Sequence, residues 1–167
     1  RNYFEILEDL LIGYRLPVFQ KKAKRKTTTH PKFYYFDVGV YRVLRKKGPL
    51  DPIEQIEGAA IETLFYQELK ATISNFSFDF DLSFWRIHEK KEVDFILYGE
   101  SGFFAFEVVR SSRIRKEDLE SLELFIEEFP AVKPYLIYGG NEKRQIGKIM
   151  VLPITEALQS LNTILKY

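Results

Sequence analysis

Two acidic residues interrupt apolar, strand-like segments in the middle of this 167-residue chain. Asp94 lies in the segment 92–98, and Glu107 lies in the segment 103–109, which follows a glycine-containing turn. Burying a carboxylate costs free energy unless an ion pair, hydrogen bonds or a metal ion compensate it. Two carboxylates that face each other across a hairpin therefore indicate a site for a divalent cation.

The spacing of these acids predicts what else belongs to the site. The two-residue period of β-strands places Asp94 and Glu107 on the same side of the hairpin. We expect a helix at 53–74 to cover that side and to add Glu62, an acid in its otherwise apolar stripe. These carboxylates, with the backbone carbonyl of Val108, offer the hard oxygen ligands that suit Mg²⁺ or Mn²⁺. A cation held there would activate water and stabilise charge on a phosphodiester.

The same acids also fit an arrangement without a metal ion, in which basic neighbours or solvent neutralise them. The pairs in this alternative are Asp94 with Arg86 or Lys91, and Glu107 with Arg110 or Arg113. Glu62 would then face solvent. Spacing alone leaves both alternatives open.

Hydrophobic periodicity predicts the elements that must position these residues. The expected order is helix 53–74, strands 83–88, 92–98 and 103–109, helix 116–128, strands 134–138 and 149–152, and helix 154–165. A strand meander that is followed by a helical crossover predicts an α/β domain with a mixed sheet.

The first 36 residues have a different character. A helix at 2–12, a basic run and a strand at 32–36 resemble the back half of a winged helix, and a solvated basic turn on a small αβ unit explains them equally well. A short helix is expected at 37–45. Candidate contacts to a nucleic-acid backbone are Lys21, Lys22, Lys24 and Arg25 in the basic run, and Arg113 in a second basic cluster after the hairpin.

The composition excludes several classes of protein. Apolar residues make up 46% and charged residues 29% of the chain, a balance typical of globular proteins. The net charge of +1 does not by itself demand a nucleic-acid partner, and the absence of cysteine excludes disulfides and thiolate metal sites. No apolar run is long enough for a membrane span, so we expect a cytoplasmic protein without a membrane partner. Met150 is the only methionine, so we expect the chain to be a fragment of a longer protein.

With these motifs the sequence resembles the restriction-endonuclease-like PD-(D/E)XK superfamily, whose core has the order αβββαβ. The resemblance assigns Glu62 to the helix acid, Asp94 to the strand Asp and Glu107 to the first position of the E-x-K motif. These three residues are then the catalytic candidates, and Asp94, Glu107 and Val108 are the candidate metal ligands. The motif lysine is replaced by Val109, which can neither position an attacking water nor stabilise charge.

This replacement leaves the enzyme class open. Lys70, Lys91 or Lys116 would have to supply the lysine from another element. Three retained acids without a lysine fit a weak Mg²⁺- or Mn²⁺-dependent nuclease, a metal-binding relic or a pure binding domain.

More narrowly, the chain is similar to the C-terminal, nuclease-like domain of unassigned function in a prokaryotic family of AAA-type ATPases. The phrases that carry this similarity lie at 31–44, 58–62, 84–97 and 106–125. The resemblance implies a partial winged-helix segment with a linking strand at 1–36 and a restriction-endonuclease-like domain at 37–167. Any ATP chemistry would then lie in a P-loop domain outside this chain.

The function that the resemblance implies is an accessory domain that binds DNA or the ATPase domain of its own chain, with phosphodiester hydrolysis weak or lost. Two alternatives remain open at this point. One is an active Mg²⁺-dependent DNA endonuclease with a displaced lysine, and the other is a protein-interaction or oligomerisation module.

Overall fold

The structure is a computed structural model that describes residues 3–20, 30–45, 48–87 and 91–166. This part of the chain is a mixed α/β structure with five helices, a six-stranded mixed sheet and a small two-stranded sheet. Its elements are α1 (Tyr3–Asp9), β1 (Gly13–Leu16), β2 (Lys32–Tyr35), α2 (Val38–Leu44), α3 (Ile53–Asn75), β3 (Asp81–Arg86), β4 (Glu92–Gly99), β5 (Gly102–Val109), α4 (Lys116–Glu128), β6 (Lys133–Tyr138), β7 (Arg144–Ile146), β8 (Ile149–Pro153) and α5 (Ile154–Ile164). No helix among the described residues is long and apolar enough to cross a membrane.

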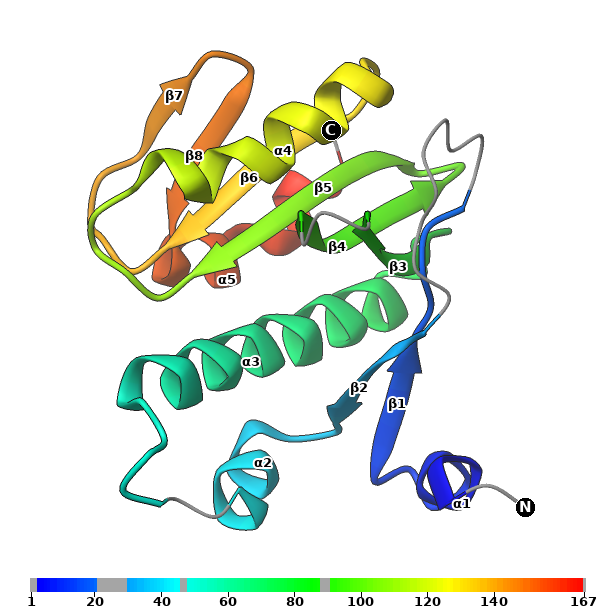
Figure 1. Ribbon diagram of the computed structural model, residues 1–167. Coiled ribbons are helices and arrows are strands. Elements are labelled where there is room, and N and C mark those ends of the chain that lie inside the picture. Colours follow the sequence, from blue (N-terminus) through cyan, green and yellow to red (C-terminus); the bar gives the residue numbers. More distant parts are fainter. Residues whose placement is uncertain (1–2, 21–29, 46–47, 88–90, 167) are drawn as a thin grey trace.

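The large sheet has the strand order β3-β4-β5-β6-β8-β7 (Figure 1). Strands β3, β4 and β5 form an antiparallel meander, and α4 then makes the crossover to β6, which is parallel to β5. This confirms the meander and the crossover that the sequence predicts. The short edge strand β7 was not predicted, because its residues are mostly exposed and show no apolar alternation.

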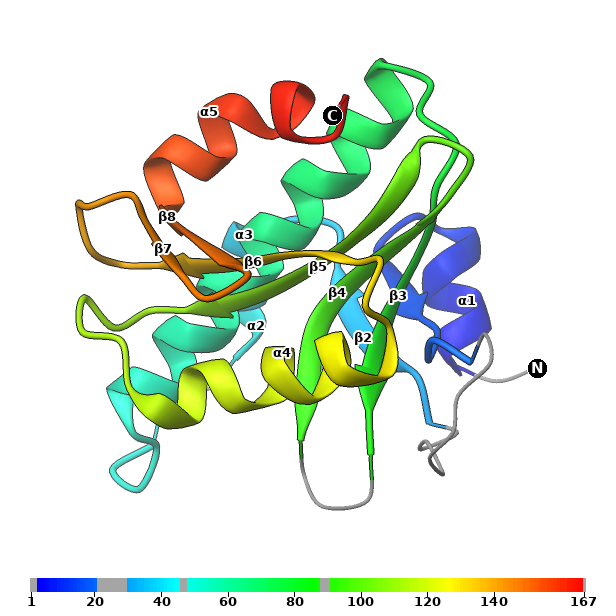
Figure 2. The ribbon, with the colours of Figure 1, turned by 90° about the horizontal axis from the view of Figure 1, so that it is seen from above.

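Helices cover both faces of the large sheet, as Figures 1 and 2 show. On one face, Phe65 and Leu69 of α3 pack with Phe95 of β4 and with residues of α5. On the other face, Leu122 and Phe125 of α4 pack with residues of β4, β5 and β6. The helices predicted at 53–74 and 116–128 therefore both bury apolar side chains against the sheet.

The N-terminal segment lies on the outer side of α3, where β1 and β2 pair antiparallel (Figure 1). The chain after β1 continues along the edge strand β3. The N–H of Phe84 donates to the carbonyl of Pro17 at 2.9 Å, and the N–H of Phe19 donates to the carbonyl of Phe84 at 2.7 Å. Leu16 and Phe19 are buried. These contacts fix β1 and its partner β2 against the core.

Strand β4 departs from regular alternation where the site lies. The register of β4 against β3 shifts over the stretch that contains Asp94. Val93 and Ile96 both pack on the α4 face, whereas Phe95 packs on the α3 face. An extra residue in one strand of an antiparallel pair is a β-bulge, which re-aims side chains. The strict two-residue alternation predicted for this strand is therefore wrong at the bulge.

Candidate acid–lysine site between α3 and the central sheet

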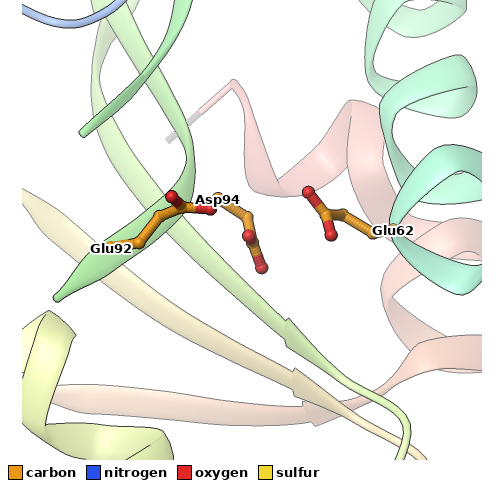
Figure 3. Close-up of side chains that lie close together, drawn as sticks. All are labelled: Glu62, Glu92 and Asp94. Carbon is orange, nitrogen blue, oxygen red and sulfur yellow. The ribbon is translucent and has the colours of Figure 1, made fainter. Parts of the chain in front are cut away.

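Three carboxylates converge in the space between α3 and β4 (Figure 3). Oxygen atoms of Glu62, Glu92 and Asp94 all lie within 4.8 Å of one another. Glu62 comes from the first half of α3, and the other two acids come from the start of β4. The structure thus brings together two of the three predicted catalytic acids and adds Glu92, which the sequence analysis had not assigned to the site.

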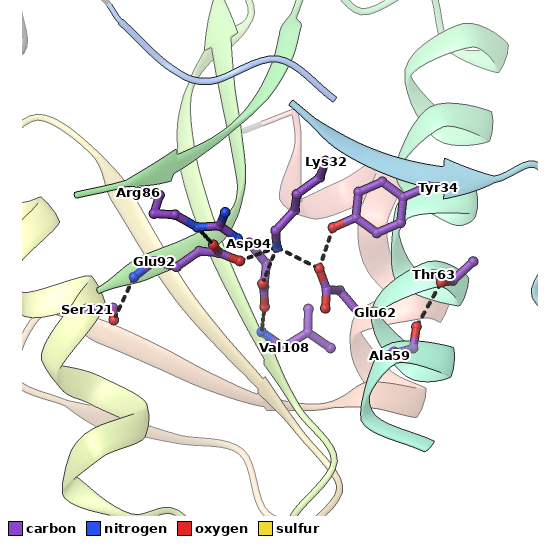
Figure 4. Close-up of polar contacts among 10 residues, drawn as sticks. All are labelled: Lys32, Tyr34, Ala59, Glu62, Thr63, Arg86, Glu92, Asp94, Val108 and Ser121. Atoms are coloured by element: carbon purple, nitrogen blue, oxygen red, sulfur yellow. Dashed lines mark hydrogen bonds and ion pairs between the residues drawn. The ribbon is translucent and has the colours of Figure 1, made fainter. Parts of the chain in front are cut away.

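A lysine from the N-terminal segment lies in the middle of these acids (Figure 4). The Nζ atom of Lys32, at the start of β2, lies 2.8 Å from Oε1 of Glu62 and 3.0 Å from Oδ1 of Asp94. It also forms an ion pair with Glu92. The Lys32 side chain retains only 15% of its exposure, so these three carboxylates replace most of its hydration. We call Lys32, Glu62, Glu92 and Asp94 the acid–lysine cluster.

Further polar contacts hold the acids of this cluster in place (Figure 4). Tyr34, two residues after Lys32 on β2, donates its hydroxyl hydrogen to Glu62. Arg86 of β3 forms an ion pair with Glu92. The backbone N–H of Val108 donates to Oδ2 of Asp94 at 3.0 Å. Val108 therefore contacts the cluster through its N–H, whereas the sequence analysis had assigned its carbonyl as a metal ligand.

Glu107, the third predicted acid, does not belong to the group of carboxylates that converge within 4.8 Å. Its Oε2 atom is buried and has no hydrogen-bond partner among the described residues. Burial raises the pKa of Glu107 well above its usual value, and the neighbouring carboxylate of Asp94 raises it further. A buried carboxyl group without a donor is disfavoured in its ionised form.

The charges of the cluster also shift the pKa values of Asp94 and Lys32. Burial and the carboxylate of Glu62 raise the pKa of Asp94 to about 6, against the opposing effects of Lys32 and the Val108 N–H. Burial acts to lower the pKa of Lys32, but the carboxylates of Asp94, Glu62 and Glu92 outweigh it and raise the pKa above its usual value. Lys32 therefore remains an ammonium ion throughout the physiological range.

The pairings that the metal-free alternative had proposed do not form among the described residues. Asp94 pairs with Lys32, while Arg86 pairs with Glu92 and Lys91 pairs with Glu120. No ion pair joins Glu107 to Arg110 or Arg113 in the described part of the chain. A basic side chain does pair with the acids, but it is Lys32, so the partner assignments of this alternative were wrong.

None of the three proposed replacement lysines enters the cluster. Lys70 lies over the ring of Tyr14, Lys91 is held by Glu120, and Lys116 is exposed at the start of α4. Val109, to which the sequence resemblance assigns the place of the motif lysine, packs on the α4 face. The lysine that enters the cluster is Lys32, which sequence reasoning missed. Its alternation with Tyr34, a buried residue in the short strand 32–36, was the available signal.

Of the residues predicted to contact nucleic acid, only Arg113 lies in the described part of the chain. Lys21, Lys22, Lys24 and Arg25 lie outside the described residues. Arg113 is exposed in the loop before α4, where its backbone N–H donates to Oγ of Ser111. These residues remain predictions.

Two family models match the sequence of this chain. A family model described as a domain of unknown function, DUF4143, matches residues 57–157, which are more than half of the chain. The chain belongs to the DUF4143 family. A second model, also described as a domain of unknown function, DUF8612, matches residues 1–51. No curated protein matches the chain.

The two family matches divide the acid–lysine cluster between them. Glu62, Glu92 and Asp94 lie in the DUF4143 region, and Lys32 lies in the DUF8612 region. The cluster is thus an ion-paired junction between two segments that different family models describe. Chemically, its carboxylates can hold one cation tightly, and in this structure an ammonium ion takes that role.

Proposed function

We propose that this chain is a nuclease-like accessory domain of a multidomain P-loop ATPase. It would bind nucleic acid or a partner protein, with phosphodiester hydrolysis weak or lost. The order of α3, β3, β4, β5, α4 and β6 is the order expected for a restriction-endonuclease-like core, which supports this proposal. The ATPase and a complete winged helix are inferred from the sequence resemblance alone.

The position of Lys32 is the observation that supports weak or lost hydrolysis. The ammonium group of Lys32 lies at hydrogen-bond distance from acids that a divalent cation would need as ligands. A metal ion could enter only by displacing an ion pair that is already desolvated and that Tyr34 and Arg86 support. Val109, in the motif lysine position, supplies no other cation.

A second candidate function is an Mg²⁺-dependent nuclease in which Lys32 is the displaced lysine. The observation that favours it is the buried, unpartnered Oε2 atom of Glu107. A divalent cation bound beside Asp94 could be coordinated by that oxygen atom. Lys32 would then move away from the carboxylates and contact the substrate.

Calorimetric titration of Mn²⁺ and Mg²⁺ into the wild-type protein separates these candidates, together with a cleavage assay on plasmid and single-stranded DNA. The accessory-domain proposal expects no binding at millimolar metal, and cleavage that is absent or too weak to depend on added metal. It also expects Lys32→Met, which removes the ammonium but keeps an unbranched side chain, to gain metal affinity. The nuclease candidate expects wild-type binding and cleavage that Asp94→Asn abolishes. Wild-type cleavage of that kind would overturn the loss of hydrolysis.

Fluorescence anisotropy with a short DNA duplex tests the nucleic-acid partner. A protein that neutralises phosphates loses affinity as salt rises, with a logarithmic slope of roughly −0.9 per phosphate contact. We expect a shallower slope when the basic run is neutralised by Lys21→Gln, Lys22→Gln, Lys24→Gln and Arg25→Gln. The control is the double change Lys143→Gln and Lys148→Gln, two lysines that flank the edge strand β7. An equal slope in the two variants would exclude the basic run and favour a protein partner.

A further inference from the structure

A pocket of about 380 Å³ lies beside the N-terminal segment, next to the C-terminal half of α3, whereas the acid–lysine cluster lies next to the first half of that helix. Its lining residues come from α1, β1, the C-terminal half of α3 and the start of β3. Ligand pockets typically measure about 300–1,000 Å³ and occur preferentially between structural units. This pocket, like the acid–lysine cluster, lies between the regions that the two family models match.

Apolar and aromatic side chains form most of the pocket wall. Three aromatic rings line it, those of Tyr14, Tyr66 and Phe80, and the aliphatic side chains of Leu16 and Ile73 complete the apolar surface. Flat, apolar surfaces of this kind favour a ligand with a planar ring, because aromatic pairs gain from stacked and edge contacts beyond their buried area.

The charged groups of the pocket, Glu8, Arg15 and Lys70, together carry one net positive charge. Glu8 accepts hydrogen bonds from the backbone N–H and the guanidinium of Arg15, which occupies both of its carboxylate oxygens. Lys70 has no ion-pair partner in the described part of the chain, and its Nζ lies 3.0 Å from the centroid of the Tyr14 ring. A single free ammonium ion beside a paired carboxylate suits a monoanion better than a phosphate dianion, which the carboxylate of Glu8 would repel.

We propose that this pocket binds a small aromatic carboxylate, whose ring packs between Tyr14, Tyr66 and Phe80 and whose carboxylate pairs with Lys70. The site shares no residue with the acid–lysine cluster, although Tyr66 of the pocket stacks on Tyr34, which donates to Glu62 of the cluster. The inference does not use the proposed function. It assigns a binding role to Lys70, one of the lysines that the sequence analysis had considered for catalysis.

The test is an NMR titration of the ¹⁵N-labelled protein with 2-naphthoate and with its neutral analogue 2-naphthamide. The two probes share the ring and differ in charge, so their comparison isolates the contribution of the ammonium group. We expect 2-naphthoate to shift the amide signals of Tyr14, Tyr66 and Ile73 and to bind about fivefold or more tightly than 2-naphthamide.

Variants of Lys70 complete the test. Lys70→Met should bring the affinity for 2-naphthoate down to that of 2-naphthamide, while Lys70→Arg should keep it within about twofold. The control Lys143→Met removes an exposed lysine that pairs with Glu156 far along the chain, and it should change neither affinity. Equal affinities for the two probes in the wild-type protein would overturn the proposal without any variant. Shifts confined to other residues, or full binding by Lys70→Met, would also overturn it.

Discussion

Two lysines that contact the junction between the N-terminal segment and α3 have opposite electrostatic environments. Lys32 is surrounded by three carboxylates, and its pKa is raised despite burial. Lys70 lies over the ring of Tyr14 without an ion-pair partner among the described residues, and burial lowers its pKa. Lys32 is held in ion pairs within the structure, while the ammonium group of Lys70 can pair with a bound ligand. Burial alone therefore does not tell which charged residue is functional, because the compensating partners decide.

The largest effect should come from removing Lys32. Lys32→Met leaves Glu62, Glu92 and Asp94 close together without their shared cation, and the loss of one partner from a buried ion pair costs about 3 kcal/mol. Urea denaturation measures this as a lower free energy of unfolding. The matched control is Lys143→Met, whose exposed pair with Glu156 should contribute less than about 0.5 kcal/mol. If both variants unfold at the same urea concentration, solvent rather than protein compensates the acids.

The second effect concerns pH. Asp94 and Glu107 have raised pKa values, so the native state holds more protons than the unfolded chain above about pH 4.5. Their contribution to the stability of the fold is therefore favourable at low pH and is lost as pH rises toward 7.

Glu107→Gln tests this pH dependence directly. The variant should gain stability at neutral pH, because it removes a carboxyl group whose ionised form is disfavoured by burial, and its stability should depend less on pH above the usual pKa of a glutamate. Urea denaturation at several pH values measures both quantities. Glu123→Gln, on the exposed face of α4, is the control and should follow the wild-type curve. A pH dependence that is the same in Glu107→Gln and the wild type would contradict a raised pKa for Glu107.

A smaller effect is expected at the hydroxyl that supports the cluster. Tyr34→Phe removes the hydrogen bond to Glu62 but keeps the ring, whose centroid lies 4.4 Å from that of Tyr66. A hydrogen bond to a charged group contributes about 1.5 kcal/mol at the lower end of its range, and Lys32 still compensates Glu62 in the variant. The free energy of unfolding should fall by about this amount. Tyr35→Phe, on the alternate face of β2, is the control. Equal stability of the two variants would show that the Tyr34 hydroxyl is replaced by water.

Sequence reasoning succeeded where local periodicity decides the structure. The bounds of α4 and the positions of α3 and the strand meander follow from apolar spacing, because each element buries one face. Glu62 and Asp94 were both recognised as polar residues in apolar segments, but it is the bulge in β4, and not the two-residue spacing, that turns Asp94 toward α3.

It failed where the structure depends on contacts between distant segments. Lys32 reaches the acids because β1 continues along the edge of β3 and carries β2 with it, and no local pattern records that docking. The bulge in β4 depends on the register of this strand against β3, so it could not be predicted from the sequence of β4 alone. The short strands β1 and β7 have too few apolar residues to show a period.

The smallest effect should come from the other lysine, and it decides whether the comparison holds. Lys70→Met removes a partly desolvated ammonium group together with its contact to Tyr14, two contributions of opposite sign and of similar size. We therefore expect the free energy of unfolding to change by less than about 0.5 kcal/mol, in contrast to Lys32→Met. Lys70→Arg, which keeps the charge, should be equally stable. A loss as large as that of Lys32→Met would mean that Lys70 is also committed to the fold, and the difference between the two lysines would then vanish. A neutral result leaves the charge of Lys70 without a structural role, which is the condition for a residue that is kept to bind a ligand.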